Sequence, residues 1–371
     1  MTNEEKKQYL IDLHALLLKH RPYDKGLSEE EAKNREEAFW NDFHANLYPR
    51  LPKAFYKYRN ARKNSIESFE KEMAWYSQPN RFDDTTDFVI NADIESQLEA
   101  YEADPTAITK MAVLGLIKSI AARHGIVIDM EELEKAIPLF TEDGRLNTKE
   151  TRLYLSSKMK GSKGAVGECM SQISSFFSSM ASKKIEKAMA DYLKAYFKVN
   201  AKLRKDTLSL CLAEEEDIQA MWGLYANCSK GFCIRYVFPP DSMLGKRMLL
   251  NLYPIYYGEK PKVDAFGVLN RGLQRGNDSS WLAEEDERDW FVSVFTKDES
   301  YSFQKEWRIT FDKRFGGNLQ GFPFATAIIL GERVREDKKE ALIKVAKRLG
   351  LEIYARELSK TGSKVITTKI G

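Results

Sequence analysis

The stretch "YSFQKEWRITF", residues 301–311, joins a β-rich run to two polar side chains that stand two positions apart. Side chains in a strand point alternately to its two faces, so we expect Gln304, Glu306 and Arg308 on one face and Trp307 on the other. Such a polar face is either solvated or aims a pair of ligands into a cleft. These residues alone leave both interpretations open.

Composition describes a globular chain. Its 371 residues are 43% hydrophobic and 30% charged, and 58 basic residues against 55 acidic ones give a net charge of +3. The length fits one large domain with insertions or two smaller domains. The charge is too balanced to indicate nucleic-acid binding by itself.

Neither the cysteines nor the N-terminus points to secretion. The four cysteines form no CxxC pair, which predicts small buried residues in a reducing compartment. The first twenty residues are charged and lack the apolar core of a signal peptide, and no run approaches the ~20 apolar residues of a membrane span. We therefore expect a cytoplasmic protein without a membrane partner.

Hydrophobic periodicity divides the chain into three parts. Residues 1–50 have helical spacing and predict an N-terminal helical extension, and residues 92–205 predict a large helical insertion. Strand patterns fill residues 51–91 and 206–371, with further helices among them. The expected fold is α+β, with a mixed, mainly antiparallel sheet core.

Two local signals refine this interpretation. Ser28 precedes a helical run and is a candidate N-cap. Residues 155–183 are rich in serine, lysine, glycine and methionine, which favours a mobile connection. The chain has neither a GxGxxG nor a Walker A motif, so the common nucleotide-binding loops are absent.

Four polar-aromatic clusters follow one another along the strand-rich parts. They are "KYR" at 57–59, "WYSQPNRFDD" at 75–84, "MWGLYANCSKGF" at 221–232, and Lys297 followed by "QKEWR" at 304–308. In this order they resemble a bacterial family known as domain of unknown function 2971. Two positions depart from that pattern: Asp83 replaces the usual asparagine, and Gln304 replaces a frequent glutamate.

The same arrangement more distantly resembles ADP-ribosyltransferases. That resemblance implies an ADP-ribosyltransferase-like core with NAD as substrate, Glu306 as the catalytic carboxylate, and Gln304 orienting the acceptor. A first-strand arginine would help to hold NAD, a middle residue would lie near the nicotinamide ribose, and aromatic side chains could stack on the bases. The implied cofactor-binding residues are Arg59, Tyr58, Tyr76, Ser77, Trp222 and Tyr225.

The chemistry of such a site is coherent. Cleaving the bond between nicotinamide and ribose builds positive charge on the ribose, and a carboxylate such as Glu306 would stabilise this oxocarbenium without a metal. The resemblance thus implies a transferase or NAD glycohydrolase inside a bacterial cell, in a toxin or phage-defence role. Its acceptor would be a macromolecule, either protein or nucleic acid.

Two other functions stay open. A nuclease-like enzyme could place Asp83, Asp84, Glu306 and Lys297 around magnesium. A non-catalytic module could bind a nucleotide or a partner.

At single residues, Trp222 and Tyr225 also fit a helix face in the core, and Asp83 and Asp84 also fit a turn cap. The transferase interpretation requires Arg59, Ser77 and Glu306 in one cleft. The binding module survives if Glu306 is exposed or is held in a salt bridge with Arg308 or Arg59.

Overall fold

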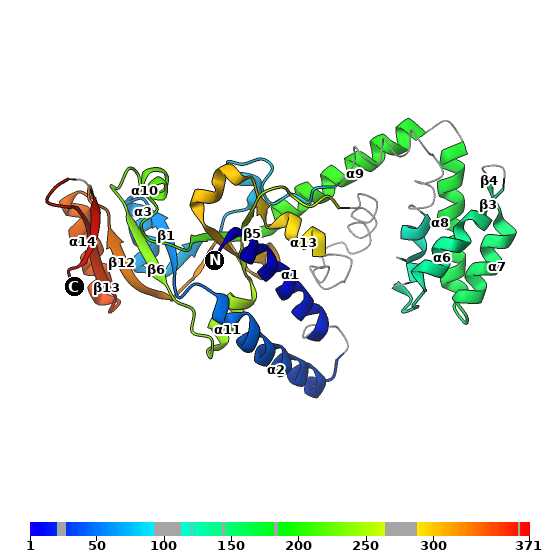
Figure 1. Cartoon of the computed structure of the whole chain (residues 1–371), viewed down its shortest axis with the longest axis horizontal. Helices are drawn as coiled ribbons and strands as arrows, with labels where there is room; N and C mark the ends of the chain where they lie inside the picture. The colour runs from blue at the N-terminus through cyan, green and yellow to red at the C-terminus, as the bar shows by residue number, and fades with distance from the viewer. Residues whose placement is uncertain are drawn as a thin grey trace. The chain divides into compact units, whose positions relative to one another are not determined.

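The computed structural model describes residues 1–20, 27–92, 113–118, 120–121, 123–142, 145–181, 185–263, 288–362 and 364–371. The chain divides into two compact units (Figure 1). Unit 1 comprises Met1–Val89, Leu203–Pro261 and Leu282–Gly371, and unit 2 comprises Ile90–Lys202 and Lys262–Trp281. The helical stretch expected at 92–205 overlaps unit 2 from 92 to 202.

An eight-stranded sheet organises unit 1. In spatial order its strands are β14 (Val365–Lys369), β13 (Glu352–Leu358), β12 (Ala325–Leu330), β6 (Phe232–Tyr236), β1 (Phe55–Arg59), β5 (Thr207–Ala213), β10 (Glu306–Asp312) and β7 (Leu252–Pro254). Within this sheet, as far as the structure describes it, β12 and β13 are the one parallel pair, and α14 (Glu336–Arg348) makes the crossover that a parallel pair needs. The α+β class and the mainly antiparallel sheet are therefore confirmed.

Helices and short strands complete unit 1. The helices are α1 (Asn3–His20), α2 (Glu29–Asn46), α3 (Lys63–Glu70), α10 (Gln219–Leu224), α11 (Met243–Leu250) and α13 (Arg288–Val294). The 3-10 turns are η1 (Tyr48–Arg50), η2 (Pro79–Arg81), η6 (Glu299–Gln304) and η7 (Lys313–Phe315). Two ribbons pair β2 (Met73–Trp75) with β11 (Leu319–Gly321), and β8 (Tyr256–Tyr257) with β9 (Thr296–Lys297).

Strand register assigns side chains to the two faces of the sheet. Ala213 pairs with Tyr56 on one side and with Glu306 on the other, so these three side chains share a face. We call it the Glu306 face. The opposite face carries Trp307 and is called the Trp307 face.

Aromatic packing fills the Trp307 face. The indole of Trp307 is fully buried, and the rings of Tyr9 in α1 and Phe55 in β1 each lie 5.5 Å from it, edge to face. Its Nε1 donates a 2.7 Å hydrogen bond to Glu214, so the polar edge of the buried ring is satisfied. Helix α1 therefore belongs to the core of unit 1.

The N-terminal helices begin as their sequences indicate. Ser28 accepts a hydrogen bond from the Glu31 amide while Glu31 reaches back to Ser28, which is a capping box and confirms the predicted N-cap. At the start of α1, the side chain of Asn3 bonds both the amide and the carbonyl of Tyr257. This pair fixes α1 beside β8.

The stretch at 301–311 is only partly a strand. Asp298 accepts the Ser300 amide and starts η6, and Lys305 ends it in the left-handed region, with φ 43° and ψ 50°. Strand β10 begins afterwards, at Glu306. The prediction that Gln304 belongs to the strand is therefore wrong, because the turn and not strand alternation orients its side chain.

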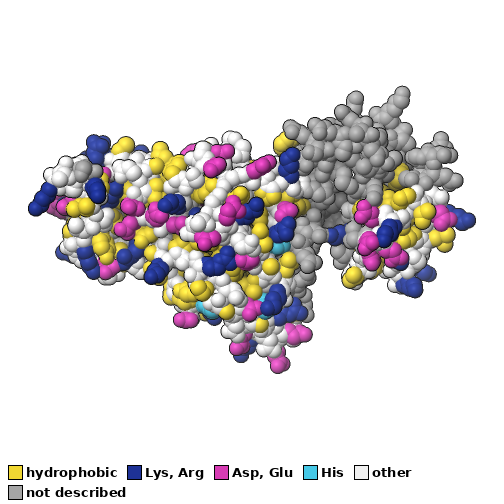
Figure 2. All heavy atoms as spheres, in the orientation of Figure 1, with side chains coloured by type: hydrophobic (Ala, Val, Ile, Leu, Met, Phe, Trp, Pro, Cys, Tyr) yellow, Lys and Arg dark blue, Asp and Glu magenta, His cyan; other side chains and the backbone are white. Residues whose placement is uncertain are grey.

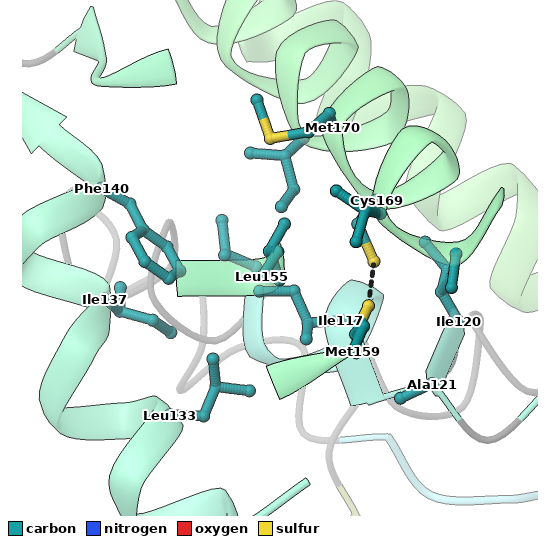
Figure 3. Close-up of a cluster of buried hydrophobic side chains, with 14 of the residues drawn as sticks. Ile117, Ile120, Ala121, Leu133, Ile137, Phe140, Leu155, Met159, Cys169 and Met170 are labelled. Carbon is teal, nitrogen blue, oxygen red and sulfur yellow. Dashed lines mark hydrogen bonds between the residues drawn. The ribbon is translucent and has the colours of Figure 1, made fainter. Parts of the chain in front are cut away.

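Unit 2 has its own helical core (Figure 3). Its elements are α6 (Met130–Ala136), η3 (Ile137–Phe140), β3 (Thr141–Glu142), β4 (Arg145–Leu146), α7 (Thr148–Lys158) and α8 (Lys163–Ala181), and α9 (Ile185–Asp206) contributes to both units. Buried Cys169, Met170 and Ile173 lie on one side of α8, and the thiol of Cys169 is 4.0 Å from the sulfur of Met159.

This packing corrects the prediction of a mobile connection over residues 155–181; the last two positions of that prediction, 182 and 183, lie outside the described residues. Apolar residues at helical spacing were outnumbered by serine and lysine in composition, but they suffice to bury one side of α8.

Among the described residues, no helix combines the length and the apolar character needed to span a bilayer.

Candidate functional site

Four charged side chains meet on the Glu306 face: Asp87, Lys297, Glu306 and Arg308, here called the charge cluster. The Arg308 guanidinium binds both oxygens of Asp87 at 2.7 and 2.8 Å. It also donates to both oxygens of Glu306, from Nε at 2.7 Å and from Nη2 at 3.1 Å. Each member is at most 7% exposed. Two positive and two negative charges compensate one another, as buried charges require.

The Lys297 ammonium joins the cluster to Gln304. Its Nζ donates to Oε1 of Gln304 at 2.9 Å and lies 3.4 Å from carboxylate oxygens of both Glu306 and Asp87. The ring of Tyr301 lies 4.4 Å away, in cation–π range. Three acceptors thus surround an ammonium that has three protons to donate.

Neighbouring strands hold the cluster in place. Glu306 and Arg308 are two residues apart on β10 and therefore share a face. Lys297 pairs with Tyr257 across β8 and β9, and the hydroxyl of Tyr257 accepts the Glu306 amide at 2.8 Å. One tyrosine therefore fixes the separation between the lysine and the glutamate.

Asp87 comes from a loop with its own supports. Asp84 accepts hydrogen bonds from the amide and the hydroxyl of Thr86 at 2.8 and 2.7 Å, which forms an Asx turn. The Lys260 ammonium donates to the carbonyl of Thr86, and the ring of Phe82 lies 5.0 Å from the Arg308 guanidinium. The turn-cap interpretation of Asp84 is confirmed.

The opposite charges of Glu306 and Lys297 stabilise each other's ionised form. Burial alone would raise the pKa of the Glu306 carboxyl, but Arg308 and Lys297 outweigh it and lower the pKa to about 2. Burial alone would lower the pKa of Lys297, but Glu306 and Asp87 raise it above its usual value. Beside Glu306, burial raises the pKa of the Cys211 thiol to about 12, and Glu306 adds to the shift. That thiol is therefore protonated and unreactive.

Tyr225 is the exposed edge of this site. Nε2 of Gln304 donates to the Tyr225 hydroxyl at 3.1 Å, while its Oε1 accepts from Lys297. Tyr225 is 43% exposed, whereas Gln304 is 4% exposed. Among the predicted site residues, the structure thus brings together Glu306, Gln304 and Tyr225. The side-chain amide of Gln304 links the Tyr225 hydroxyl to the Lys297 ammonium.

Tyr58 and Trp222 have structural positions on the same face. The Tyr58 hydroxyl donates to the carbonyl of Glu215 and accepts the Ile218 amide, so it anchors the start of α10. Trp222 is fully buried between the ring of Tyr58, at 5.3 Å, and the guanidinium of Arg356, at 4.3 Å. Its indole leaves no face for a ligand, and the core interpretation of Trp222 is confirmed.

Arg59 and Tyr76 lie on the other side of the sheet. Arg59 is three residues beyond Tyr56 on β1, and three steps along a strand reverse the face. Tyr76 is 1% exposed, and its ring packs 5.9 Å from Phe311, which is five residues beyond Glu306 on β10. The structure therefore does not bring either residue to Glu306.

Ser77 shares the Glu306 face but lies farther along it. It pairs with Ser209 through two hydrogen bonds of 2.8 and 2.9 Å between backbone groups. Ser209 is four residues along β5 from Ala213, the partner of Glu306, which corresponds to about 13 Å of strand. The single cleft with Arg59, Ser77 and Glu306 is not formed.

No metal-ligand set accompanies the cluster. Among the residues that the structure describes, no three His, Cys, Asp or Glu side chains are grouped to hold an ion. The Asp84 carboxylate accepts the hydrogen bonds of the Asx turn at Thr86, and Asp83 is exposed to solvent. The member missed by sequence reasoning is Asp87, which stands in "RFDDTTDF" with nothing to distinguish it from the aspartates before it.

Comparison with known proteins adds one finding. No curated protein and no solved structure matches the chain. One segment of the chain, residues 221–309, matches a protein-family model. This segment contains Lys297, Gln304, Glu306 and Arg308 but not Asp87. Residues 221–309 match the family described as protein of unknown function (DUF2971), which confirms the resemblance to that family over this segment.

Proposed function

We propose that unit 1 is a non-catalytic module that binds a nucleotide or a partner, with the charge cluster as its structural centre. One observation carries this proposal: both carboxylate oxygens of Glu306 are engaged by Arg308 and Lys297, and the side chain is 5% exposed. A carboxylate in this state holds a fold together and presents no free oxygen to a substrate.

Energetics support the same conclusion. To accept a ribose hydroxyl, Glu306 would have to give up contacts with Arg308 or Lys297 inside a buried cluster. Breaking a buried ion pair typically costs about 3–5 kcal/mol, which ligand binding would have to supply. The position of Arg59 on the opposite face also removes the proposed NAD anchor from this side of the sheet.

An NAD-using ADP-ribosyltransferase or NAD glycohydrolase is the second candidate. It is favoured by a carboxylate whose pKa is lowered to about 2, so that it is ionised at neutral pH, and which is connected through Lys297 and Gln304 to the exposed Tyr225. If substrate opens the cluster, Glu306 would stabilise the ribosyl oxocarbenium without a metal. The acceptor would be a protein or nucleic acid, in a bacterial toxin or defence role.

NAD consumption separates the two candidates. Purified protein is incubated with NAD and cell lysate, and released nicotinamide is measured for wild type, Glu306→Gln and Tyr225→Phe. The binding module releases none with any variant. Release by wild type that Glu306→Gln abolishes, with circular dichroism showing both proteins folded, would overturn the module and favour the transferase.

Tyr225→Phe is the informative control, because it removes the hydroxyl at the exposed edge and leaves every charge of the cluster in place. Loss of turnover in this variant would locate the substrate at that edge. Calorimetry with NAD and ADP then measures binding independently of chemistry.

A further inference from the structure

Four basic residues have neighbouring backbone positions at one edge of the sheet in unit 1. They are Arg59, Arg62, Lys230 and Arg333, here called the basic edge. Figure 2 shows basic and acidic side chains mixed over the described surface of one face of the molecule. The basic edge is where β1 ends, β6 begins and β12 ends.

Backbone contacts bring these residues together. Arg59 pairs with Phe232, the first residue of β6, which places Lys230 beside the end of β1. The amide of Arg333 donates to the carbonyl of Ser229 at 3.0 Å, so the segment after β12 runs next to the same turn. Arg62 stands three residues beyond Arg59, at the start of α3.

The segment before β6 packs closely against the end of β1. A Cβ added at Gly231 would lie 2.1 Å from the Arg59 carbonyl oxygen, so only glycine fits there. The preceding residues Asn227, Cys228 and Ser229 all have positive φ, between 53° and 61°. A tight turn therefore presses Lys230 against the end of β1.

These four side chains form no salt bridge with a carboxylate among the described residues. The electrostatic neighbour of the Arg59 guanidinium is the phenol of Tyr236. Arg62, Lys230 and Arg333 are exposed, and Arg59 is half-buried.

The carboxylates nearby serve other cations. Glu332 lies 3.5 Å from Arg356, and Asp337 lies 2.7 Å from Arg335. A half-buried guanidinium without a counter-charge carries a desolvation cost that a bound anion relieves.

We propose that the basic edge binds the phosphate groups of a free nucleotide or of a nucleic-acid strand. This rests on the proposed function, whose ligand class and site it names. Guanidinium groups bind phosphate oxygens in pairs, and several cations along one edge suit a ligand with more than one phosphate. The near-neutral charge of the whole chain does not oppose this, because attraction depends on the local field.

Fluorescence anisotropy tests the proposal on the full chain. The probes are labelled ADP and a labelled twenty-nucleotide single-stranded RNA, each titrated between 50 and 200 mM salt. The test variant combines Arg62→Ala, Lys230→Ala and Arg333→Ala. The matched control combines Lys33→Ala, Lys53→Ala and Lys360→Ala, which removes the same charge from exposed lysines elsewhere in unit 1.

We expect the test variant to weaken RNA binding at least tenfold and the control to weaken it less than twofold. The slope of log affinity against log salt should fall by about 2, since each lost contact to a single strand contributes about 0.7. Binding of ADP that also needs the basic edge, without tighter binding of RNA, would assign the site to a free nucleotide.

Equal losses in the two triple variants would overturn the site, since bulk charge would then explain binding. Absence of binding of both probes to wild type at 50 mM salt would also overturn it. Either failure is distinct from failure of the proposed module, which only nicotinamide release dependent on Glu306 would reveal.

Discussion

Glu306 is the residue on which the interpretation of the site depends. Its carboxylate is one of two negative charges that balance Lys297 and Arg308 in a region almost closed to solvent. Removal of one partner from such a group leaves an uncompensated buried charge, whose cost exceeds the net value of the pair. The cluster is thus sensitive to charge balance more than to any single contact.

Charge balance predicts the outcome of a double-mutant cycle. Glu306→Gln should lower the free energy of unfolding by about 3–5 kcal/mol, because two cations then face Asp87 alone. Adding Lys297→Met removes the surplus charge and should recover part of the loss. Urea denaturation of the two single variants and the double variant measures the coupling. Strictly additive losses would show that the charges do not act together.

The pKa of Glu306 predicts how stability depends on pH. Its value is about 2 in the folded chain against a usual 4.5, so the folded state binds this proton less readily than the unfolded state. The resulting stabilisation is complete above about pH 4.5 and is lost as pH falls toward 2.

Urea midpoints measured between pH 6 and pH 3 for wild type and Glu306→Gln check this. The difference in unfolding free energy between the two should shrink as pH falls. A difference that stays constant over this range would contradict the low folded pKa.

At the scale of elements, close approach between β1 and β6 depends on Gly231. Gly231→Ala would press a Cβ against the Arg59 carbonyl, a backbone atom that cannot move aside, and should destabilise by about 1–3 kcal/mol or more. Gly223→Ala is the matched control, because the site lies in α10 and a Cβ there meets nothing within 4 Å. It should stabilise by about 0.5–1 kcal/mol. Thermal melting of both variants tests the pair, and equal melting temperatures would contradict the packing.

Elements were predictable where one local signal dominated. Ser28 with Glu31 is a pattern that only a helix start satisfies, and it predicts the beginning of α2. Lys305 gives no such signal, since its left-handed conformation is uncommon for lysine and is imposed by the turn before β10. Because the residues around Lys305 have strand-like character, the sequence predicted that Gln304 belongs to the strand. The strand in fact begins two positions later, at Glu306.

The site was predictable only in the part that lies on one strand. Alternation along β10 gives Glu306 and Arg308 a common face without knowledge of the rest of the fold. Asp87 reaches them from a loop more than two hundred residues away in sequence, and no local pattern encodes that contact. For the same reason Arg59 was wrongly expected beside Glu306: the face that a strand presents depends on its register with β5.

At the scale of the whole molecule, each unit buries its own core. Leu155 is fully buried among the helices of unit 2, and Phe55 is 2% exposed against Trp307 in unit 1. A cavity left by either side chain removes contacts from one unit only, because the packing around each is internal to that unit. The two cores should therefore respond separately to substitution.

Hydrogen exchange read by mass spectrometry tests this separation. Leu155→Ala should destabilise unit 2 by about 2–5 kcal/mol and speed exchange in peptides from residues 145–181, while peptides from β5 and β10 keep wild-type rates. Phe55→Ala should cost about 3–5 kcal/mol and do the reverse. Parallel acceleration across both units in either variant would mean that they unfold as one cooperative body. Separate responses would establish that the sheet carrying the charge cluster and the basic edge keeps its stability when the helical core is weakened.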